Sequence, residues 1–205
     1  MTWLRYLPVS ALIICLISLA FHFTRLLRIG VPKDYSRQRG DLTSALAYSF
    51  LGAMSPTKKE SAFFHLPTYV AGLLYHAGTF VSITLFFVFF EVVPGGLIRT
   101  VLVLVLAASV LSGTGILVKR TVLSKLRSLS NPDDYISNIL VTVFHVSTAV
   151  VLVEESINLF YVLSATLLLL YIPLGKLKHL LYFFAARYHL GFFYGWRGIW
   201  PSIKS

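Results

Sequence analysis

The sequence predicts an all-α integral membrane protein: a bundle of five transmembrane helices with its N-terminus outside and its C-terminus in the cytoplasm. Hydrophobic residues make up 57% of the chain and charged residues 13%, which is about half the charged share of a typical soluble domain. Apolar runs of about 20 residues, the length needed to cross a bilayer, recur five times. Lys and Arg collect on one side of these runs, and this bias sets the orientation.

The predicted spans cover residues 6–27, 61–91, 97–119, 135–153 and 156–185 of a single membrane domain, 1–205. The first run is interpreted as a retained helix, because it is long enough to span and has no convincing signal-peptide cleavage site. A turn at Glu91–Gly96 separates the second and third spans, and Asn131-Pro132-Asp133-Asp134 is typical of a helix start. Glu154-Glu155 leaves so short a connection that the last two spans should form an antiparallel hairpin.

The polar segments lie on the basic side of the predicted spans. Residues 28–60 form a cytoplasmic segment with a short amphipathic stretch, Leu42–Met54, expected at the inner membrane surface. Residues 186–205 form a cytoplasmic tail. The predicted inner side holds 16 of the 18 Lys and Arg residues, and only Arg5 and Arg99 fall on the other side. The positive-inside rule therefore predicts a multi-pass protein of the inner (cytoplasmic) membrane.

Composition also excludes several kinds of site. The single cysteine, Cys15, cannot build a disulfide framework, a zinc site or an iron–sulfur cluster. The net charge of +10 lies between apolar runs, so it favours the bilayer surface or an acidic partner over nucleic acid. A redox role would therefore require a group held by histidines, or a partner chain.

Histidines are the candidate functional residues, because ionisable side chains inside a bilayer are costly and are usually functional. A haem between two helices needs one histidine from each helix at matching depth. The second and fifth spans run in opposite directions, so His76 and His179 can face each other. His65 and His189 form a second candidate pair, since they lie about 16.5 and 15 Å further toward the cytoplasm.

The remaining alternatives stay open at this point. Helical geometry weighs against the second pair, because His189 lies about 80° off the line of His179. His145 is an alternative haem ligand or a hydrogen-bond donor to a quinone. His22 is expected to pack rather than to ligate. For the histidines within the spans, the competing interpretation is an ordinary hydrogen-bonded packing residue. For His65 and His189 it is a helix cap or a contact with lipid headgroups.

Two stretches resemble the haem-bearing helices of a known family. They are Leu74-Tyr75-His76-Ala77-Gly78 and Tyr171-Ile172-Pro173-Leu174-Gly175-Lys176-Leu177-Lys178-His179. The family is that of the respiratory nitrate reductase gamma subunit, with the membrane subunits of heterodisulfide reductase-type and sulfite-reduction complexes. The resemblance covers residues 60–200. It implies five helices and b-type haem between the second and fifth, with electrons passing between membrane quinone and a cytoplasmic-side iron–sulfur subunit.

Carried over to this chain, the resemblance implies that His76 and His179 are the axial ligands of the haem nearer the cytoplasm. It suggests Gly72 and Gly78 as small residues packed against the haem edge, with ordinary helix packing as the alternative. Three basic residues of the fifth span and the tail could neutralise haem propionates or anchor lipid headgroups: Lys176, Lys178 and Arg187.

The sequence also departs from the family. Two-haem members have further histidines where this chain has Phe86 and Tyr161. The resemblance therefore implies one haem b, and a second is left open only through His145 or the His65–His189 pair. Tyr161 remains a candidate quinone contact, together with His145.

The resulting functional hypothesis is a cytochrome b membrane-anchor subunit. It would pass electrons between quinone or quinol and an iron–sulfur subunit, and would not be a complete enzyme alone. The alternative from a different class is a haem-free anchor or scaffold for a soluble complex. A small transporter subunit is less favoured, because no span carries a buried acid or a pair of interrupted repeats.

Overall fold

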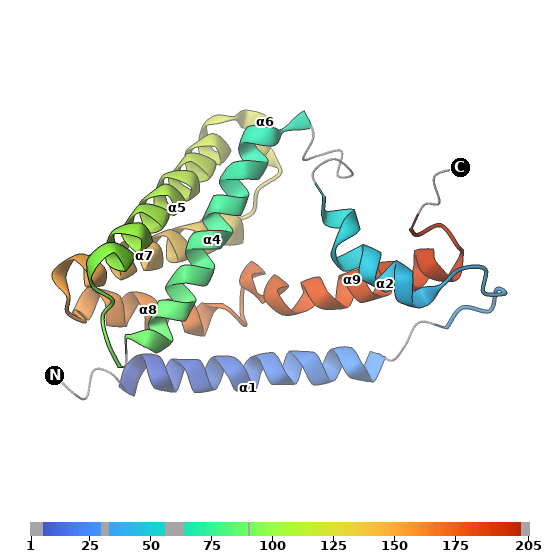
Figure 1. Cartoon of the computed structure of the whole chain (residues 1–205), viewed down its shortest axis with the longest axis horizontal. Coiled ribbons are helices and arrows are strands. Elements are labelled where there is room, and N and C mark those ends of the chain that lie inside the picture. The colour runs from blue at the N-terminus through green and yellow to red at the C-terminus, as the bar shows by residue number, and fades with distance from the viewer. Residues whose placement is uncertain (1–5, 30–32, 56–63, 90, 202–205) are drawn as a thin grey trace. The chain divides into compact units, whose positions relative to one another are not determined.

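A computed structural model describes residues 6–29, 33–55, 64–89 and 91–201, and every regular element in these ranges is a helix (Figure 1). The long helices are α1 (Tyr6–Ile29), α4 (Leu66–Val88), α5 (Gly96–Val122) and α7 (Pro132–Glu154), followed by α8 (Leu159–Tyr171) and α9 (His179–Trp196). The shorter ones are α2 (Leu42–Phe50), η2 (Gly52–Met54), α6 (Ser124–Ser128) and η3 (Lys176–Lys178). The all-α prediction is confirmed.

Four of the described helices, α1, α4, α5 and α7, are long and apolar enough to cross a membrane. The count rises to five if the broken pair formed by α8 and α9 is one span. The chain is therefore a multi-pass membrane protein, and helices occupy the ranges predicted as spans over 6–27, 97–119 and 135–153 to within a few residues. The direction in which they cross stays a prediction.

The second span is shorter than predicted. Residues 61–63 of the predicted range lie outside the described residues, and α4 itself begins at Leu66. Pro67 explains this start, because proline suits the first turn of a helix, where its missing N–H has no partner to lose. His65 therefore precedes α4, so the helical angle assumed between His65 and His76 does not apply.

The helix predicted over 156–185 is not continuous, which corrects the sequence interpretation. It ends at Tyr171, and α9 begins only at His179 and runs on to Trp196, into the stretch predicted as a tail. Pro173 has no N–H to donate to the helical ladder. Leu174 and Gly175 instead donate their N–H groups to the Tyr171 carbonyl at 3.0 Å, which closes a turn.

The described chain forms two compact units: Met1–Leu16 with Pro67–Leu177 (unit 1), and Ile17–Leu66 with Lys178–Ser205 (unit 2). Unit 1 contains α4, α5, α7 and α8 around an apolar core that includes Leu106, Val151 and Leu152, all 0% exposed. Helices α7 and α8 form the predicted hairpin, and the Ser147 and Ser164 hydroxyls hydrogen-bond between them at 2.6 Å.

Capping residues set the ends of this hairpin. Asn131 and Asp134 form a capping box at the start of α7, with Pro132 in its first turn, as the sequence predicted. Asn158 caps α8 by accepting the N–H of Tyr161 at 2.9 Å. Between them Glu155 takes a left-handed conformation, with φ 54°, which reverses the chain within a few residues.

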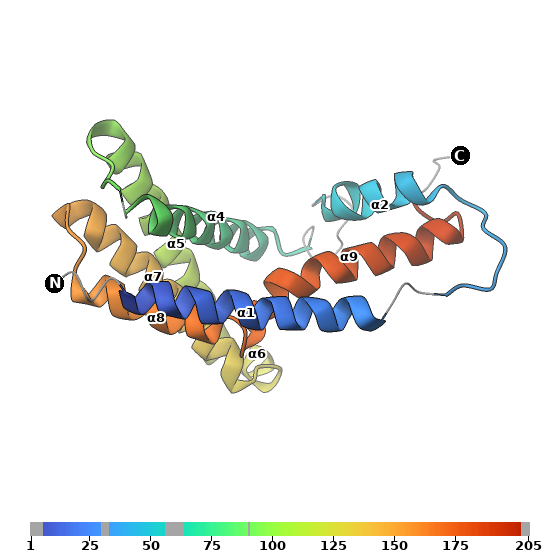
Figure 2. The ribbon, with the colours of Figure 1, turned by 90° about the horizontal axis from the view of Figure 1, so that it is seen from below.

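In unit 2, helices α2 and α9 lie side by side (Figures 1 and 2). Small residues make the contact, since Ala45 and Ser49 of α2 are both 0% exposed. A Cβ at Gly195 would lie 2.4 Å from the Ala45 Cβ, and one at Gly191 would lie 2.9 Å from Leu46 Cδ2. This close approach is the small-residue packing by which helices associate where apolar burial contributes little. The helix predicted within Leu42–Met54 is confirmed, but its place at the membrane surface stays a prediction.

Candidate functional site

His76 lies near the middle of α4, and its side chain is exposed. The rotation of α4 is fixed by its neighbour Tyr75, whose hydroxyl donates to the Asn138 carbonyl at 2.8 Å and lies 2.9 Å from Thr142 Oγ1. Both partners belong to α7. Because successive helical residues are about 100° apart, anchoring Tyr75 against α7 turns His76 away from that helix.

The two glycines expected at the haem edge have different surroundings. Gly72 lies one turn before His76, on the same face of α4, and a Cβ built on it would meet nothing within 4 Å. Gly78 is buried against α5, where a Cβ would lie 2.2 Å from Ser109 Oγ and 2.3 Å from Ser109 Cβ. Gly72 therefore leaves open space on the His76 face, whereas Gly78 allows α4 and α5 to pack closely.

His145 of α7 is 0% exposed, and hydroxyl groups from two other helices contact its ring nitrogens. Its Nε2 lies 3.1 Å from Thr79 Oγ1 of α4, and its Nδ1 lies 2.9 Å from Ser109 Oγ of α5. The edge of the ring also meets Tyr75, with the ring centroids 5.2 Å apart. We call Thr79, Ser109 and Tyr75 the His145 cage.

Each ring nitrogen of His145 has one hydroxyl partner in the cage. The Thr79 and Ser109 hydroxyls also lie 2.9 and 3.3 Å from the Tyr75 carbonyl oxygen, which ties the cage to the backbone of α4. A neutral imidazole has one donor and one acceptor, and the cage satisfies both. Haem ligation or a quinone contact by His145 would first break one of these bonds.

Sequence reasoning did not find this cage. Its signal is a polar stripe along α7, because Asn138, Thr142 and His145 recur at the spacing of one helix face. The partners Thr79 and Ser109 lie 66 and 36 residues from His145 in the sequence. Serine and threonine are common in membrane helices, so their spacing alone did not identify them.

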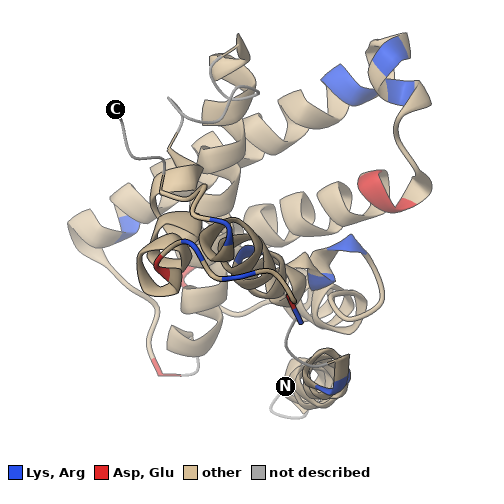
Figure 3. Cartoon of the chain, turned by 90° about the vertical axis from the view of Figure 1, so that its right-hand side faces the viewer, with Lys and Arg blue, Asp and Glu red and all other residues tan. Residues whose placement is uncertain are grey.

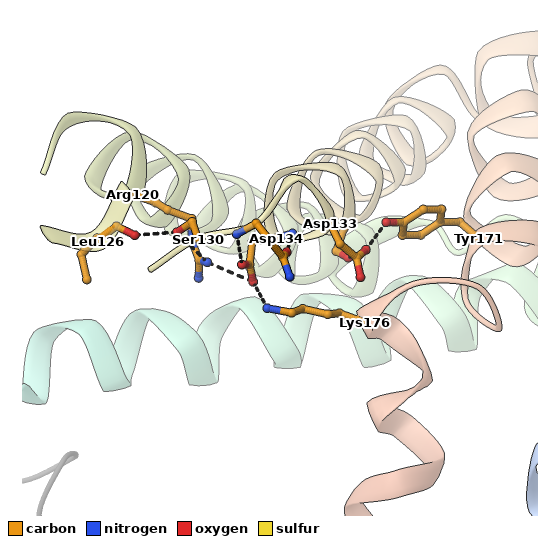
Figure 4. Close-up of polar contacts among 9 residues, drawn as sticks. Arg120, Leu126, Ser130, Asp133, Asp134, Tyr171 and Lys176 are labelled. Carbon is orange, nitrogen blue, oxygen red and sulfur yellow. Dashed lines mark hydrogen bonds and ion pairs between the residues drawn. The ribbon is translucent and has the colours of Figure 1, made fainter. Parts of the chain in front are cut away.

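His179 is exposed and begins α9, directly after the break that follows α8. Hydrogen bonds and ion pairs connect the residues around this break to the start of α7 (Figure 4). The Tyr171 hydroxyl donates to Asp133, and the Lys176 ammonium pairs with Asp134. Asp134 also pairs with Arg120 of α5 at 3.0 Å. Lys176, a candidate partner for haem propionates, is therefore already bound to a carboxylate.

The other histidines are more peripheral. His65 and His189 are exposed, before α4 and within α9 respectively. His22 is half-buried in α1, with its Nδ1 3.4 Å from the Tyr182 hydroxyl. His65 and His189 both belong to unit 2, whereas His76 belongs to unit 1 and His179 to unit 2. Both pairings remain predictions.

The positions that hold outer-haem histidines in two-haem members of the family that the sequence resembles are packed with aromatic side chains. Phe86 is 5% exposed, and Tyr161 is 3% exposed. The Tyr161 ring stacks on Phe144 at 5.9 Å and meets the edge of Phe89 at 5.5 Å. Within the described residues, the buried Tyr161 hydroxyl has no hydrogen-bond partner.

The described residues contain no group of three or more His, Cys, Asp and Glu side chains that could hold a metal ion. Axial ligation of a haem requires only two imidazoles. No protein-family model, curated protein or solved structure matches the chain. The family resemblance therefore depends on the two quoted sequence stretches alone.

Proposed function

We propose that the chain is a cytochrome b-type subunit of the inner membrane. It passes electrons between membrane quinone or quinol and a soluble iron–sulfur partner on the cytoplasmic side. His76 and His179 are the axial ligands of one haem b, as the resemblance of their surrounding sequences implies. The bound haem would supply one-electron chemistry, and the chain's own residues would hold and orient it.

The observation that carries this proposal is that the two histidines within the spans of unit 1 differ in burial: His145 is buried and His76 is exposed. His145 is enclosed by its cage and contributes to the packing of α4, α5 and α7. His76 is exposed at the middle of an apolar span, on the face where Gly72 leaves open space. A flat ligand that binds the His76 imidazole would also cover the open space beside Gly72.

Aromatic packing supports a single haem. Where relatives place the second pair of ligands, Phe86 and Tyr161 are buried within the core of unit 1. A macrocycle at that level would have to displace the stacked rings of Phe89, Phe144 and Tyr161. The packing of these rings therefore supports one haem rather than two.

The test is the haem content of the purified full-length chain and its reduced-minus-oxidised spectrum. The wild type is expected to bind one haem, and His76→Ala and His179→Ala should each lose it. His189→Ala is the matched control, because it removes an exposed histidine from the same helix as His179. Haem retained by both single alanine variants at the wild-type level would refute the assignment.

A ligand exchange separates loss of haem from loss of folding. His76→Met should keep the haem, because methionine is also an axial ligand, and should raise its reduction potential. An unchanged potential and spectrum in this variant would contradict ligation by His76. If the wild type binds no haem, the chain is a membrane anchor for a soluble complex. This alternative is consistent with the basic surface of unit 2 described below.

A further inference from the structure

Residues 33–41, which we call the strap, are held against the end of α9. The Trp196 indole N–H donates to the Ser36 carbonyl at 2.7 Å, and the Arg39 N–H donates to the Trp196 carbonyl at 2.8 Å. Asp34 pairs with Arg197 at 2.7 Å. The strap is thereby held at three positions along its length.

Glycine packing at the end of the strap strengthens this attachment. A Cβ at Gly40 would lie 2.4 Å from the Gly195 carbonyl oxygen and 2.6 Å from the Gly198 Cα, so only glycine allows the strap to lie this close to α9. Asp41 then caps α2 by accepting the Thr43 and Ser44 N–H groups at 3.2 and 2.9 Å. The conformation of the strap is therefore set before any partner arrives.

The strap is also exposed and basic. Lys33, Tyr35, Arg37 and Arg39 are all exposed, Tyr35 at 94%. Figure 3 shows Lys and Arg along this loop, nearest the viewer. The acidic residues of the strap do not neutralise them, because Asp41 caps α2 and Asp34 accepts from the Ser36 hydroxyl at 2.7 Å and pairs with Arg197.

The charge of the chain is concentrated in the unit that carries the strap. Lys and Arg outnumber Asp and Glu eleven to three in unit 2, but only seven to five in unit 1. We infer that the strap is a docking site for an acidic face of a soluble protein partner. That the partner is a redox protein rests on the proposed function. The docking site itself does not depend on haem binding.

The residue types favour a protein over a lipid surface. Tyrosine and arginine are enriched at the energetic centres of protein interfaces, and the preformed strap reduces the ordering cost of binding. Segments that bind membranes by amphipathic insertion need apolar side chains to bury. Residues 33–41 include no Leu, Ile, Val, Phe, Met or Trp. A carboxylate-rich protein face fits this combination of charge and rigidity.

The first experiment measures binding of a short fluorescent poly-L-glutamate peptide to the full chain in nanodiscs of neutral lipid. The strap variant is Arg37→Gln/Arg39→Gln, which leaves the backbone contacts to Trp196 in place. Its matched control is Lys125→Gln/Arg127→Gln, an exposed pair in α6 with the same spacing and the same loss of charge. Two exposed ion pairs predict a two- to thirtyfold loss of affinity, roughly, for the strap variant alone.

The outcomes are decisive in either direction. Absence of peptide binding to the wild type, or equal losses in the two variants, would overturn the docking site. A fluorophore attached through Tyr35→Cys gives a second measurement, in nanodiscs containing phosphatidylglycerol. Quenching by aqueous iodide supports a strap that faces water, whereas quenching by nitroxide-labelled lipid would show a lipid contact and refute the inference. Haem content measured on the same samples tests the proposed function separately.

Discussion

Gly78→Ala should destabilise unit 1, because the added methyl group has no space at the contact between α4 and α5. Its Cβ would lie 2.2 and 2.3 Å from the Oγ and Cβ of Ser109, whereas carbon atoms in contact prefer about 3.5–4.0 Å. Overpacking of this kind costs about 1–3 kcal/mol, and loss of the Ser109–His145 hydrogen bond adds about 1 kcal/mol. The higher helix propensity of alanine offsets about 1 kcal/mol of this cost. The free energy of unfolding should therefore fall by about 1–3 kcal/mol.

The assay is reversible unfolding of the purified chain in mixed detergent and SDS micelles, followed by circular dichroism. Gly115→Ala is the matched control, because a Cβ at Gly115 of α5 meets nothing within 4 Å. Ser109→Gly removes the clashing atoms, so Gly78→Ala should cost much less in that background than in the wild type. Equal effects of Gly78→Ala and Gly115→Ala, or additive effects of the two substitutions at the contact, would refute this packing argument.

Two further predictions concern hydrogen bonds. Ser109→Ala and Thr79→Val each remove a hydroxyl partner of the buried His145 ring, so each should destabilise the chain by about 1–3 kcal/mol in the same unfolding assay. Ser112→Ala on α5 should cost less, because the Ser112 hydroxyl donates to the Ala108 carbonyl of its own helix. Hydrogen bonds, led by the one from the Ser44 hydroxyl, hold the pKa of the Asp41 carboxyl below its ordinary value of 3.8. The ionised carboxylate therefore stabilises the folded state fully at pH values above 3.8, and this stabilisation is lost as the pH falls through the lowered pKa. Hydrogen exchange in α2 should then rise at acid pH in the wild type, and an unchanged pH dependence in Asp41→Asn would contradict the role of this carboxylate.

The helices predicted best are those whose ends are marked in the sequence itself. The span of α7 follows from an apolar run that begins at Asn131-Pro132, where the capping box forms. The break before α9 was missed, although Pro173 and Gly175 stand within it. Proline is often tolerated in membrane helices, because neighbouring groups satisfy the freed backbone. Here the chain turns instead and is held by Asp133 and Asp134, which lie some forty residues earlier in the sequence.

The candidate site was only partly predictable for a related reason. The sequence indicates which histidines lie within apolar spans, but their burial depends on the rotation of each helix. Tyr75 sets that rotation for α4 through Asn138 and Thr142, more than sixty residues away. The sequence makes His145 a candidate ligand, but it does not indicate the two hydroxyl partners that α4 and α5 supply. Side-chain partners contributed by other helices leave no local mark in a single sequence.

The glycine and hydroxyl contacts of unit 1 have a consequence for sequence variation. Lipid solvates leucine as well as a neighbouring helix does, so exchanges among Leu, Ile, Val and Phe at lipid-facing positions of α4 and α5 should change the fold little. Gly78 and Gly113 differ, because a Cβ at either would lie within 2.3 Å of a side-chain atom of a neighbouring helix. Random mutagenesis scored for accumulation of the chain in membranes should therefore give long permissive stretches, interrupted where the helices meet through glycine and hydroxyl groups.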